Sequence, residues 1–439
     1  MKTTQLTLII LLLALEGFSA HAATYRVNQD GTGDFMLIQE AIDAAVDGDE
    51  IIVHPGTYYE NIHFDSKNIT LRSTDPDDWD VVEATVIDGQ YGYTAVTFTG
   101  IEDETCLLSG FIITGGGGGW GGGISGGDAW SDPQVCTSAR INRCLITGNW
   151  AYHGAGLALC GGAITKCLIT DNWTSNGHSG GGLEACHGLI SGCKITENES
   201  TSGGGLCNCD GIIENCVIGG NIASGEYRWG GGLSGCDGKI EDCIIRNNSF
   251  GGLVNSDAMI INCLIVGNSV TDCDGSIENC TIGEGTTGET TVLARCDASI
   301  INSIIFVGLS GCDDAVITYC CIQGWTAGGE GNISADPMLI PGPLGDYYLD
   351  PESPCINAGS QSAADAGLSD CTTQADGTPD TGIVDMGYHY PIPQDEVDVE
   401  VSCSLIDDSF APGDELTGSI SLSNHGSDIW LDVYLGFVL

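Results

Sequence analysis

The chain has 439 residues, and its 60 acidic and 12 basic residues give it a formal net charge of −48. A surface of this charge repels nucleic acids and anionic membranes, so nucleic-acid binding is excluded as a function. With 42% hydrophobic residues and 66 glycines in a patterned array, the sequence is also unlike that of a disordered chain.

Residues 1–22 are typical of a secretory signal peptide. Lys2 precedes an apolar stretch from 6 to 15, and a small-residue cleavage pattern ends at Ala22. About ten apolar residues are too few to cross a bilayer of about 30 Å, and no later segment is apolar enough to do so. We therefore expect a protein that is secreted or held at the cell surface, with no membrane span in this chain.

A short helix is expected near the start of the mature chain. Asp34 is placed to cap its N-terminus, and Asp47-Gly48 ends it. Its apolar face consists of Phe35, Ile38, Ala41, Ile42 and Ala45. We expect this helix to cover the end of the structure that follows.

A repeat of about 22 residues occupies most of the remaining chain. Each copy combines a glycine-rich corner, a leucine, two cysteine positions and a closing asparagine, as in "GGGLSGCDGKIEDCIIRNN" at 230–248. Short β-branched runs without helical periodicity are typical of one coil of a parallel β-helix. We therefore predict an all-β fold over residues 23–330, with about eleven coils of this length.

The opening "DGTGDFMLIQEAIDAAVDGDEIIVHPGTYYENI" resembles the start of the pectin-lyase-like superfamily of right-handed parallel β-helix proteins. The resemblance covers residues 24 to about 323 and implies right-handed coils. Relatives in this superfamily include lyases, hydrolases and esterases. The stretch 56–60 resembles the G-x-Y-x-E stretch of pectin methylesterases, but the downstream catalytic stretches of that family are absent, as is the catalytic set of the polygalacturonases.

Two further segments follow the repeats. Residues 336–390, with "DPMLIPGPLGDYYLDPESPCINAG" and "TGIVDMGYHY", resemble the choice-of-anchor Q segment of secreted bacterial proteins. This resemblance implies secretion or surface display and no chemistry, and we assign 331–391 to the closing segment. From 392 to 439, apolar-polar alternation with Pro-Gly turns predicts a β-sandwich-like module, incomplete because we expect the sequence to be truncated.

The repeated cysteines and asparagines are interpreted as structural columns. Zinc sites favour closely spaced pairs, whereas these cysteines recur once per coil. Equivalent atoms of stacked strands lie about 4.8 Å apart, too far for ordinary disulfides, so we expect most cysteines to be buried thiols that fill the interior. The asparagines are placed at a corner, where they adopt the left-handed conformation and pass hydrogen bonds between coils. They are Asn149, Asn172, Asn198, Asn221, Asn248 and Asn268.

A column of aspartates follows the first cysteine position of successive coils. It consists of Asp210, Asp237, Asp257, Asp274, Asp297 and Asp313. Carboxylates stacked about 4.8 Å apart repel each other, which something must offset. One hypothesis is Ca²⁺, which binds several oxygen ligands and would bridge neighbouring carboxylates. The alternative is a row of solvated turns with diffuse counterions.

Aromatic side chains gather beside the glycine-rich corners. Trp120, His153 and Trp229 each immediately precede a glycine triplet or its near copy, and Ser179 and Ser202 hold the same position in other coils. Aromatic faces cover apolar sugar surfaces while polar neighbours bind hydroxyls. The candidate carbohydrate-binding residues are Trp120, Tyr152, His153, His178, Tyr227 and Trp229. The alternative is that these rings only shield the glycine-rich corner.

These observations favour a carbohydrate-binding or adhesion module, expected to be a monomer, whose partner is an extracellular polysaccharide or a cell-surface glycan. One alternative is a calcium-assisted polysaccharide lyase. Its base would remove the proton beside a uronate carboxylate, and Lys194 and Arg246 are the candidates. Another alternative is a non-catalytic spacer. A release of unsaturated sugar ends would distinguish the lyase from the binding module.

Overall fold

The computed structural model describes residues 22–127, 136–224, 229–284, 292–326, 328–392, 399–405 and 418–424. It divides into two compact units, Met1–Ala335 and Asp336–Leu439. The predicted signal peptide lies outside the described residues apart from Ala22. Within the described part, the helices are all too short or too polar to cross a membrane.

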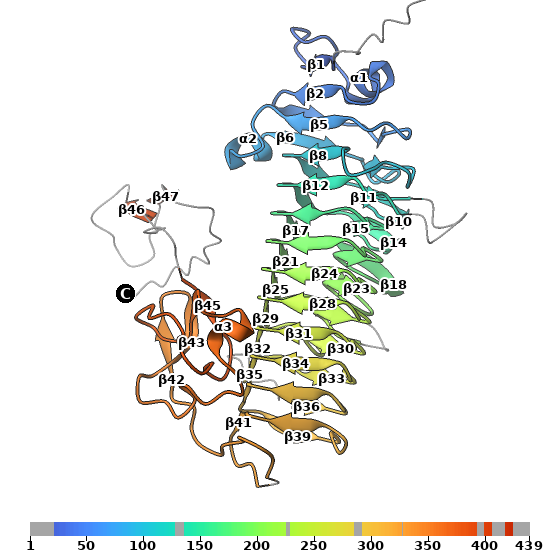
Figure 1. Cartoon of the computed structure of the whole chain (residues 1–439). Helices are drawn as coiled ribbons and strands as arrows, with labels where there is room; N and C mark the ends of the chain where they lie inside the picture. Colours follow the sequence, from blue (N-terminus) through green and yellow to red (C-terminus); the bar gives the residue numbers. More distant parts are fainter. Residues whose placement is uncertain are drawn as a thin grey trace, which may run out of the picture. The chain divides into compact units, whose positions relative to one another are not determined.

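The first unit is a right-handed parallel β-helix, as predicted (Figure 1). Its three long sheets contain 13, 12 and 11 strands, against the expectation of about eleven coils. The 13-stranded sheet consists of β1 (Thr24–Val27), β2 (Glu50–Val53), β5 (Thr70–Ser73), β8 (Leu107–Ser109), β12 (Arg140–Asn142), β16 (Ile164–Thr165), β20 (Leu189–Ser191), β24 (Ile212–Glu214), β28 (Lys239–Glu241), β31 (Met259–Ile261), β34 (Ser276–Glu278), β37 (Ser299–Ile301) and β40 (Val316–Thr318).

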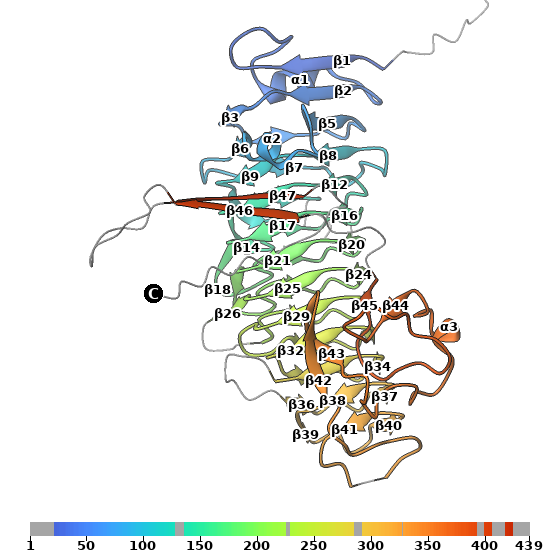
Figure 2. The ribbon, with the colours of Figure 1, turned by 90° about the vertical axis from the view of Figure 1, so that its left-hand side faces the viewer.

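The strand labels of the 12-stranded sheet run down Figure 2. This sheet consists of β3 (Gly56–Tyr58), β6 (Thr85–Asp88), β9 (Ile112–Thr114), β13 (Leu145–Thr147), β17 (Leu168–Thr170), β21 (Lys194–Thr196), β25 (Val217–Gly219), β29 (Ile244–Arg246), β32 (Leu264–Val266), β35 (Thr281–Gly283), β38 (Ile304–Ile305) and β41 (Cys321–Ile322).

The 11-stranded sheet consists of β4 (Ile62–His63), β7 (Val96–Thr97), β11 (Ile124–Ser125), β15 (Leu157–Ala158), β19 (Leu183–Glu184), β23 (Leu206–Cys207), β27 (Leu233–Ser234), β30 (Leu253–Val254), β33 (Val270–Thr271), β36 (Val292–Ala294) and β39 (Gly308–Ser310). A shorter sheet of five strands consists of β10 (Gly117–Trp120), β14 (Trp150–His153), β18 (Trp173–Ser179), β22 (Glu199–Ser200) and β26 (Ile222–Ala223).

The interior of the β-helix is filled by columns of identical or similar side chains. Leu183, Leu206 and Leu233 are register partners in the 11-stranded sheet, and all three are fully buried. Burying such a side chain contributes about 1.5–3 kcal/mol relative to leaving it exposed. Because inward and outward positions alternate along each strand, the repeat places one aliphatic side chain of each of these strands in the core.

Most cysteines of the two columns are buried thiols, as predicted, and Cys312 is half-buried. The thiol of Cys216 donates to the carbonyl of Glu214 at 3.1 Å and accepts from the backbone N–H of Cys193 at 3.4 Å. Where serine replaces cysteine, the hydroxyl takes over both roles: Ser303 donates to Ile301 at 2.9 Å and accepts from the N–H of Cys280 at 3.1 Å. The columns therefore combine packing with hydrogen bonds between coils.

The asparagine column also links the coils, but its backbone differs from the prediction. Asn198 Nδ2 donates to Asn221 Oδ1 at 3.1 Å and to the carbonyl of Ile169 at 2.9 Å, and the amide is fully buried. The prediction that these asparagines are left-handed is wrong. The left-handed residue is the one before each of them, for example Glu197 with φ of 54°. That residue turns the corner, which leaves the amide to point inward.

The glycine triplets let the chain fold back on itself between the five-stranded and 11-stranded sheets. Gly180 has φ of +64°, and a Cβ there would lie 2.6 Å from the carbonyl of Leu183. A Cβ on Gly181 would lie 2.4 Å from a carbonyl oxygen of the next coil, and one on Gly182 would lie 2.6 Å from another. Each glycine is thus required by close backbone approach.

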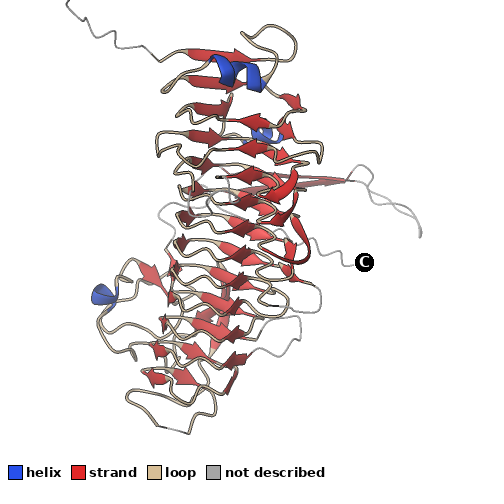
Figure 3. Ribbon diagram, turned by 90° about the vertical axis from the view of Figure 1, so that its right-hand side faces the viewer, coloured by secondary structure: helices blue, strands red, loops and turns tan. Residues whose placement is uncertain are grey.

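A helix covers the N-terminal end of the coils, as expected, but its cap is different (Figure 3). Helix α1 (Ile38–Ala44) buries Ile38 in the core, and Leu37 at its N-cap makes no side-chain cap. Asp34 instead accepts from the N–H of Arg26 at 2.8 Å. The carboxylate of Glu60 caps the helix, accepting from the N–H groups of Ile38 at 2.9 Å and Gln39 at 3.0 Å. This contact gives the G-x-Y-x-E stretch a structural role. A second short helix, α2 (Trp79–Glu83), precedes β6.

The second unit is non-repetitive. Antiparallel pairs join β42 (Leu339–Gly342) to β43 (Gly345–Leu349) and β44 (Cys371–Thr372) to β45 (Tyr390–Pro391), with α3 (Ala363–Ala366) between the pairs in the sequence. Within it His389 is fully buried, and its Nε2 lies 2.8 Å from Asp380 Oδ2. Of the predicted β-sandwich-like module the structure describes one antiparallel pair, β46 (Val399–Leu405) and β47 (Gly418–Asn424). The rest of that module lies outside the described residues.

Candidate functional site

The predicted row before the glycine triplets is a true register row. Trp120 pairs with His153, and His153 pairs with Ser179, in the five-stranded sheet. Single bridges then connect Ser179 to Ser202 and Ser202 to Trp229. We call these five residues the flank row. One position in each of these five coils therefore presents its side chain at the same place around the helix axis, and the five side chains are stacked along that axis.

A second column lies opposite the flank row, on the outer face of the 11-stranded sheet. Its register partners are Ala158, Glu184, Cys207 and Ser234. These residues alternate with the core leucines and therefore point out of the helix interior, yet all four are buried. The flank row covers them: Ser202 Oγ donates to Ser234 Oγ at 3.0 Å.

Glu184 is the charged member of this column. Only 4% of its side chain is exposed. Its Oε1 accepts from Ser179 Oγ at 2.7 Å, and its Oε2 lies 3.2 Å from His153 Nδ1. The ring of Trp120 stacks on His153, with centroids 4.3 Å apart and an interplanar angle of 19°. A buried carboxylate needs such partners, because an unpaired one would be strongly destabilising.

Ser179, His153 and Glu184 are residue types that serine hydrolases use, but their arrangement here is different. In a catalytic triad the serine and the carboxylate bind opposite nitrogens of the histidine ring. Here Ser179 Oγ lies 3.4 Å from His153 Nδ1, the same nitrogen that contacts Glu184. The serine also donates to the carboxylate directly. The three side chains therefore form a hydrogen-bonded cluster without a proton relay through the ring.

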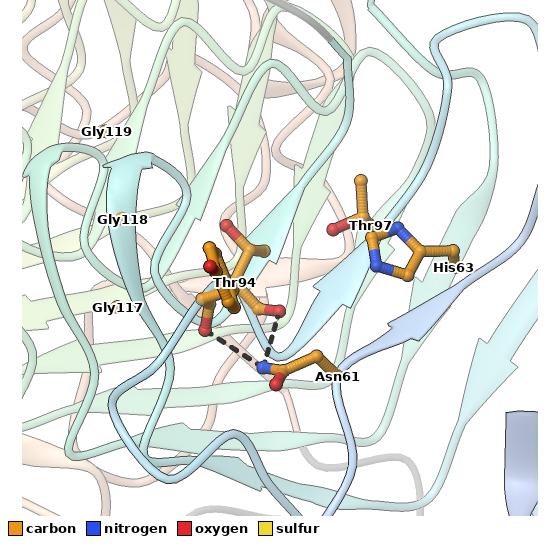
Figure 4. Close-up of a pocket in the computed structure, with 8 residues that line it drawn as sticks. Asn61, His63, Thr94, Thr97, Gly117, Gly118 and Gly119 are labelled. Atoms are coloured by element: carbon orange, nitrogen blue, oxygen red, sulfur yellow. Dashed lines mark hydrogen bonds between the residues drawn. The ribbon is translucent and has the colours of Figure 1, made fainter.

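One pocket, of about 470 Å³, lies between the five-stranded and the 11-stranded sheets near the N-terminal end of the β-helix (Figure 4). Asn61 Nδ2 donates to the carbonyls of Tyr93 at 3.1 Å and Thr94 at 3.0 Å, which fixes the loop before β7. The lining residues are Asn61, His63, Tyr93, Thr94, Thr97, Gly117, Gly118 and Gly119. We call this the first pocket. Sequence analysis predicted none of these residues.

A second pocket, of about 520 Å³, lies further along the same two sheets. Its lining residues are Gly177, His178, Ser179, Thr201, Ser202, Cys207, Asn208, Trp229, Ser234, Gly235 and Asn255. His178 and Trp229 belong to the predicted set, and 45% of Trp229 is exposed. Burial raises the pKa of the Cys207 thiol, and the negative charge of Glu184 raises it further, so this thiol stays protonated at neutral pH. We call this the second pocket.

The other predicted aromatic residues lie beside the flank row. The ring of Tyr152 lies 4.9 Å from that of His178, and His178 lies 5.1 Å from His153. Trp120 and His153 are packed against each other and line neither pocket among the described residues. Tyr227 lies outside the described residues. The structure thus brings five of the six predicted residues to one side of the β-helix, of which two reach a pocket.

The aspartate column forms a ladder of its own. The N–H of Asp257 donates to Asp237 Oδ1 at 2.9 Å, and the same contact recurs between Asp210 and Asp237 and between Asp257 and Asp274. Backbone N–H groups thus supply part of the compensation expected from a cation. Among the described residues no three acidic, histidine or cysteine side chains form a group that could hold a metal ion. Bridging Ca²⁺ therefore stays a prediction.

The last member of the predicted aspartate column is displaced by one residue. Asp297 Oδ1 accepts from the N–H of Asp314 at 3.2 Å, so Asp314 and not Asp313 continues the ladder. The reason is one extra residue between Cys312 and β40, compared with the coil before it.

Lys194 and Arg246, the candidate lyase residues, lie on the 12-stranded sheet. They begin β21 and end β29, with β25 between these strands. Both are half-buried, and their side chains make contacts of their own. Neither lines the first or the second pocket as the described residues define them. The lyase hypothesis stays a prediction.

Sequence analysis missed Glu184, and a signal for it was available. The residue after the core leucine is Ala158, Cys207, Ser234 and Val254 in neighbouring copies, and it is charged in Glu184. A single charge in an otherwise small or apolar register position indicates a specific partner. The first pocket carried no such signal, because glycine backbone forms one of its walls.

Sheet topology and register define the class of this chain: it is a parallel β-helix protein with a closed, repetitive core. No protein-family model matches the sequence. A stretch of 156 residues, 35% of the chain, is 31% identical to a cell surface glycoprotein of Methanothermus fervidus. The chain covers 23% of that relative's length.

Two solved structures are similar to the chain in outline. Pectate lyase Pel9A aligns with a TM-score of 0.48 and 16% identity over 84% of this chain and 97% of that chain. A pectin methylesterase from Aspergillus niger aligns with a TM-score of 0.25 and 14% identity over 72% of this chain and 92% of that chain.

Proposed function

We propose that this protein is secreted or displayed at the cell surface and binds a glycan chain on the side that carries the five-stranded sheet. The observation that carries the proposal is the pair of pockets, each walled by the five-stranded sheet on one side and the 11-stranded sheet on the other. Volumes of about 470 and 520 Å³ are in the range of small-ligand sites.

Each pocket offers the two kinds of contact that a sugar ring needs. Tyr93 is 75% exposed at the first pocket and Trp229 is 45% exposed at the second, so each presents an aromatic surface to the apolar face of a pyranose. Hydroxyl and amide groups surround them, including Thr97 and Ser202. The parallel register holds Thr97, Ser202 and Trp229 in place before any ligand arrives, which lowers the ordering cost of binding.

The location rests on three supports. The N-terminal residues have the pattern of a signal peptide. The matched relative is a cell surface glycoprotein. The closing segment resembles a choice-of-anchor Q segment, and we propose that it serves surface display. We expect the protein to be a monomer, which light scattering coupled to size-exclusion chromatography would test.

Binding to a panel of soluble extracellular polysaccharides, measured by affinity electrophoresis and calorimetry, tests the function. Trp229→Ala removes the aromatic wall of the second pocket and is expected to weaken binding at least about tenfold, which corresponds to about 1.4 kcal/mol. Tyr59→Ala is the matched control, because Tyr59 is 62% exposed and lines neither pocket among the described residues. Equal losses in both variants, or no binding to any polysaccharide, would refute the proposal.

A further inference from the structure

We infer that the second pocket takes an uncharged sugar residue and discriminates against uronates. The inference rests on the proposed glycan binding and names the class of sugar. It follows from the direction of the hydrogen bonds in the pocket wall and from the buried charge behind that wall.

Two serine hydroxyls in the wall of the second pocket donate hydrogen bonds to neighbouring side chains. Ser179 Oγ donates to Glu184 Oε1 at 2.7 Å, and Ser202 Oγ donates to Ser234 Oγ at 3.0 Å. A serine hydroxyl has one proton and two lone pairs. Both hydroxyls therefore present lone pairs to the pocket, and a ligand must bring donors to meet them.

Other groups at the pocket supply donors, so the lining as a whole has mixed polarity. Thr201 Oγ1 accepts from the N–H of Gly177 at 2.8 Å, which leaves its own proton available. The side-chain amides of Asn208 and Asn255 each donate and accept. Sugar hydroxyls also do both, whereas an ionised carboxylate only accepts. The hydroxyls of a neutral sugar thus match this lining, and the carboxylate of a uronate does not match the two serines.

Charge acts in the same direction. Glu184 is 4% exposed directly behind Ser179, and His153 holds its other oxygen while stacking on Trp120. No lysine or arginine is found among the described residues that line the pocket. A uronate carboxylate would enter a site with a buried carboxylate nearby and with His178 as the one basic side chain among the described lining residues, on a chain of net charge −48.

The experiment compares oligosaccharides of equal length on the full chain by isothermal titration calorimetry. The neutral probes are hexamers of galactose, glucose and xylose, and the anionic probe is the hexamer of galacturonate, with and without added Ca²⁺. We expect at least one neutral hexamer to bind about tenfold or more tightly than the galacturonate hexamer. Tighter binding of galacturonate would overturn the inference while leaving glycan binding intact. No binding of any probe would overturn both proposals.

Glu184→Gln tests the role of the buried charge. It removes the carboxylate and gives Ser179 a partner that can donate, so the ratio of galacturonate to neutral affinity is expected to rise about tenfold. Glu214→Gln is the matched control, because Glu214 accepts from Ser191 Oγ at 3.0 Å and lines neither pocket among the described residues. An unchanged ratio in the Glu184 variant, or an equal rise in the control, would overturn the inference.

Ser202→Ala keeps the inference testable if the Glu184 variant does not fold. It removes one acceptor from the wall and retains the charge of Glu184. We expect this variant to bind the neutral hexamer at least about threefold more weakly and to bind the galacturonate hexamer with unchanged affinity. An equal effect on both probes would show that the serine has no part in the discrimination.

Discussion

Two ladders of this β-helix, one of asparagines and one of aspartates, join neighbouring coils by hydrogen bonds at two different corners. In the asparagine ladder, the N–H of Asn172 donates to Asn198 Oδ1 at 3.1 Å. In the aspartate ladder, the N–H of Asp257 donates to Asp237 Oδ1 at 2.9 Å. The donor belongs to the earlier coil in the first case and to the later coil in the second. A side-chain oxygen thus joins neighbouring coils at two corners, with opposite directions.

The environment determines which side chain each ladder uses. Asn198 is fully buried and makes four ladder contacts through its amide, whereas Asp237 and Asp257 are exposed. A neutral amide can be buried when all its groups are bonded, but a stack of carboxylates requires water and counterions. The two corners thus use the same kind of contact, a backbone N–H bonded to a side-chain oxygen of a neighbouring coil, with an amide where the corner is buried and a carboxylate where it is exposed. The expected consequence is a stiff, perturbation-sensitive interior and a tolerant exterior.

The largest expected effect on the interior columns is a loss of stability at alkaline pH. Burial raises the pKa of the column thiols well above its usual value in Cys144, Cys167, Cys186, Cys193, Cys209, Cys216 and Cys263. In Cys236 the hydrogen bond with Cys209 raises the pKa first, and burial adds to it. The folded state therefore keeps protons that the unfolded chain loses. The stability is fully present below the unfolded-state pKa of about 8.5 and falls as the pH rises above it.

A thiol that ionises only in the unfolded chain contributes a slope of at most about 1.4 kcal/mol per pH unit, so several such thiols together make the free energy of unfolding fall steeply. We expect cooperative unfolding within one or two pH units above about 9. Circular dichroism in the presence of a reductant measures this unfolding. Replacing Cys193 and Cys216 by serine should lower the slope by about 3 kcal/mol per pH unit. A flat free energy of unfolding up to about pH 10.5 would show that these thiols ionise without unfolding.

Asn198→Ala is expected to have the next largest effect. It removes four hydrogen bonds and leaves the amide of Asn172 and the carbonyl of Ile169 without their partner in a buried corner. We expect a loss of about 3–5 kcal/mol in the free energy of unfolding, measured by urea denaturation. Asn247→Gly is the control: Asn247 is exposed and has φ of 53°, so glycine should change stability by less than about 1 kcal/mol. Similar losses in both variants would contradict the ladder.

Cys216→Ser should have a smaller effect. Ser256 and Ser303 already occupy the two cysteine positions in other coils, with both hydrogen bonds made. We expect a loss of about 1 kcal/mol in urea denaturation, whereas Cys216→Val removes the hydrogen bonds and overfills the column, with a loss of about 2 kcal/mol or more. A valine variant as stable as the serine variant would show that the thiol column is held by packing alone.

The exterior ladder should respond least. Asp257→Asn keeps an oxygen acceptor for the N–H of Asp274 and removes one charge from the column. We expect a change of no more than about 0.5 kcal/mol, in the stabilising direction, and a smaller stabilisation by added salt than in the unchanged protein. Thermal unfolding with and without a chelator completes the test. A clear drop in Tm on chelation would support bridging Ca²⁺ in this column.

Much of the fold was predictable because the same pattern of residues recurs in each coil. Leu183 and its register partners, the cysteine positions and the flank row from Trp120 to Trp229 all follow from aligning the copies, since equal positions stack in a parallel helix. The exceptions are contacts that the repeat does not contain. Glu60 caps α1 across 22 residues of sequence, and the G-x-Y-x-E stretch that contains it does not indicate this contact.

The candidate site was predictable only in outline. Aromatic residues indicated the side of the helix on which the two pockets lie, but the pockets depend on which coils carry small residues. Trp120 and His153 stack on each other and fill their part of the flank, whereas Ser179 and Ser202 leave room. The pairing of Glu184 with Ser179 joins adjacent members of two columns, which a one-dimensional alignment does not bring together. Asp313 failed as a prediction because a single inserted residue shifts the backbone N–H that faces Asp297.

Both pockets lie between the five-stranded and the 11-stranded sheets, but at different coils, so the coil spacing fixes the distance between them. Parallel strands are stacked at about 4.8 Å, so the spacing between the pockets can change only in steps of one coil. Duplication or loss of one repeat between them would lengthen or shorten that spacing by one such step, with every neighbour contact of the remaining coils preserved. The number of repeats between the pockets therefore sets the distance between them in steps of one coil.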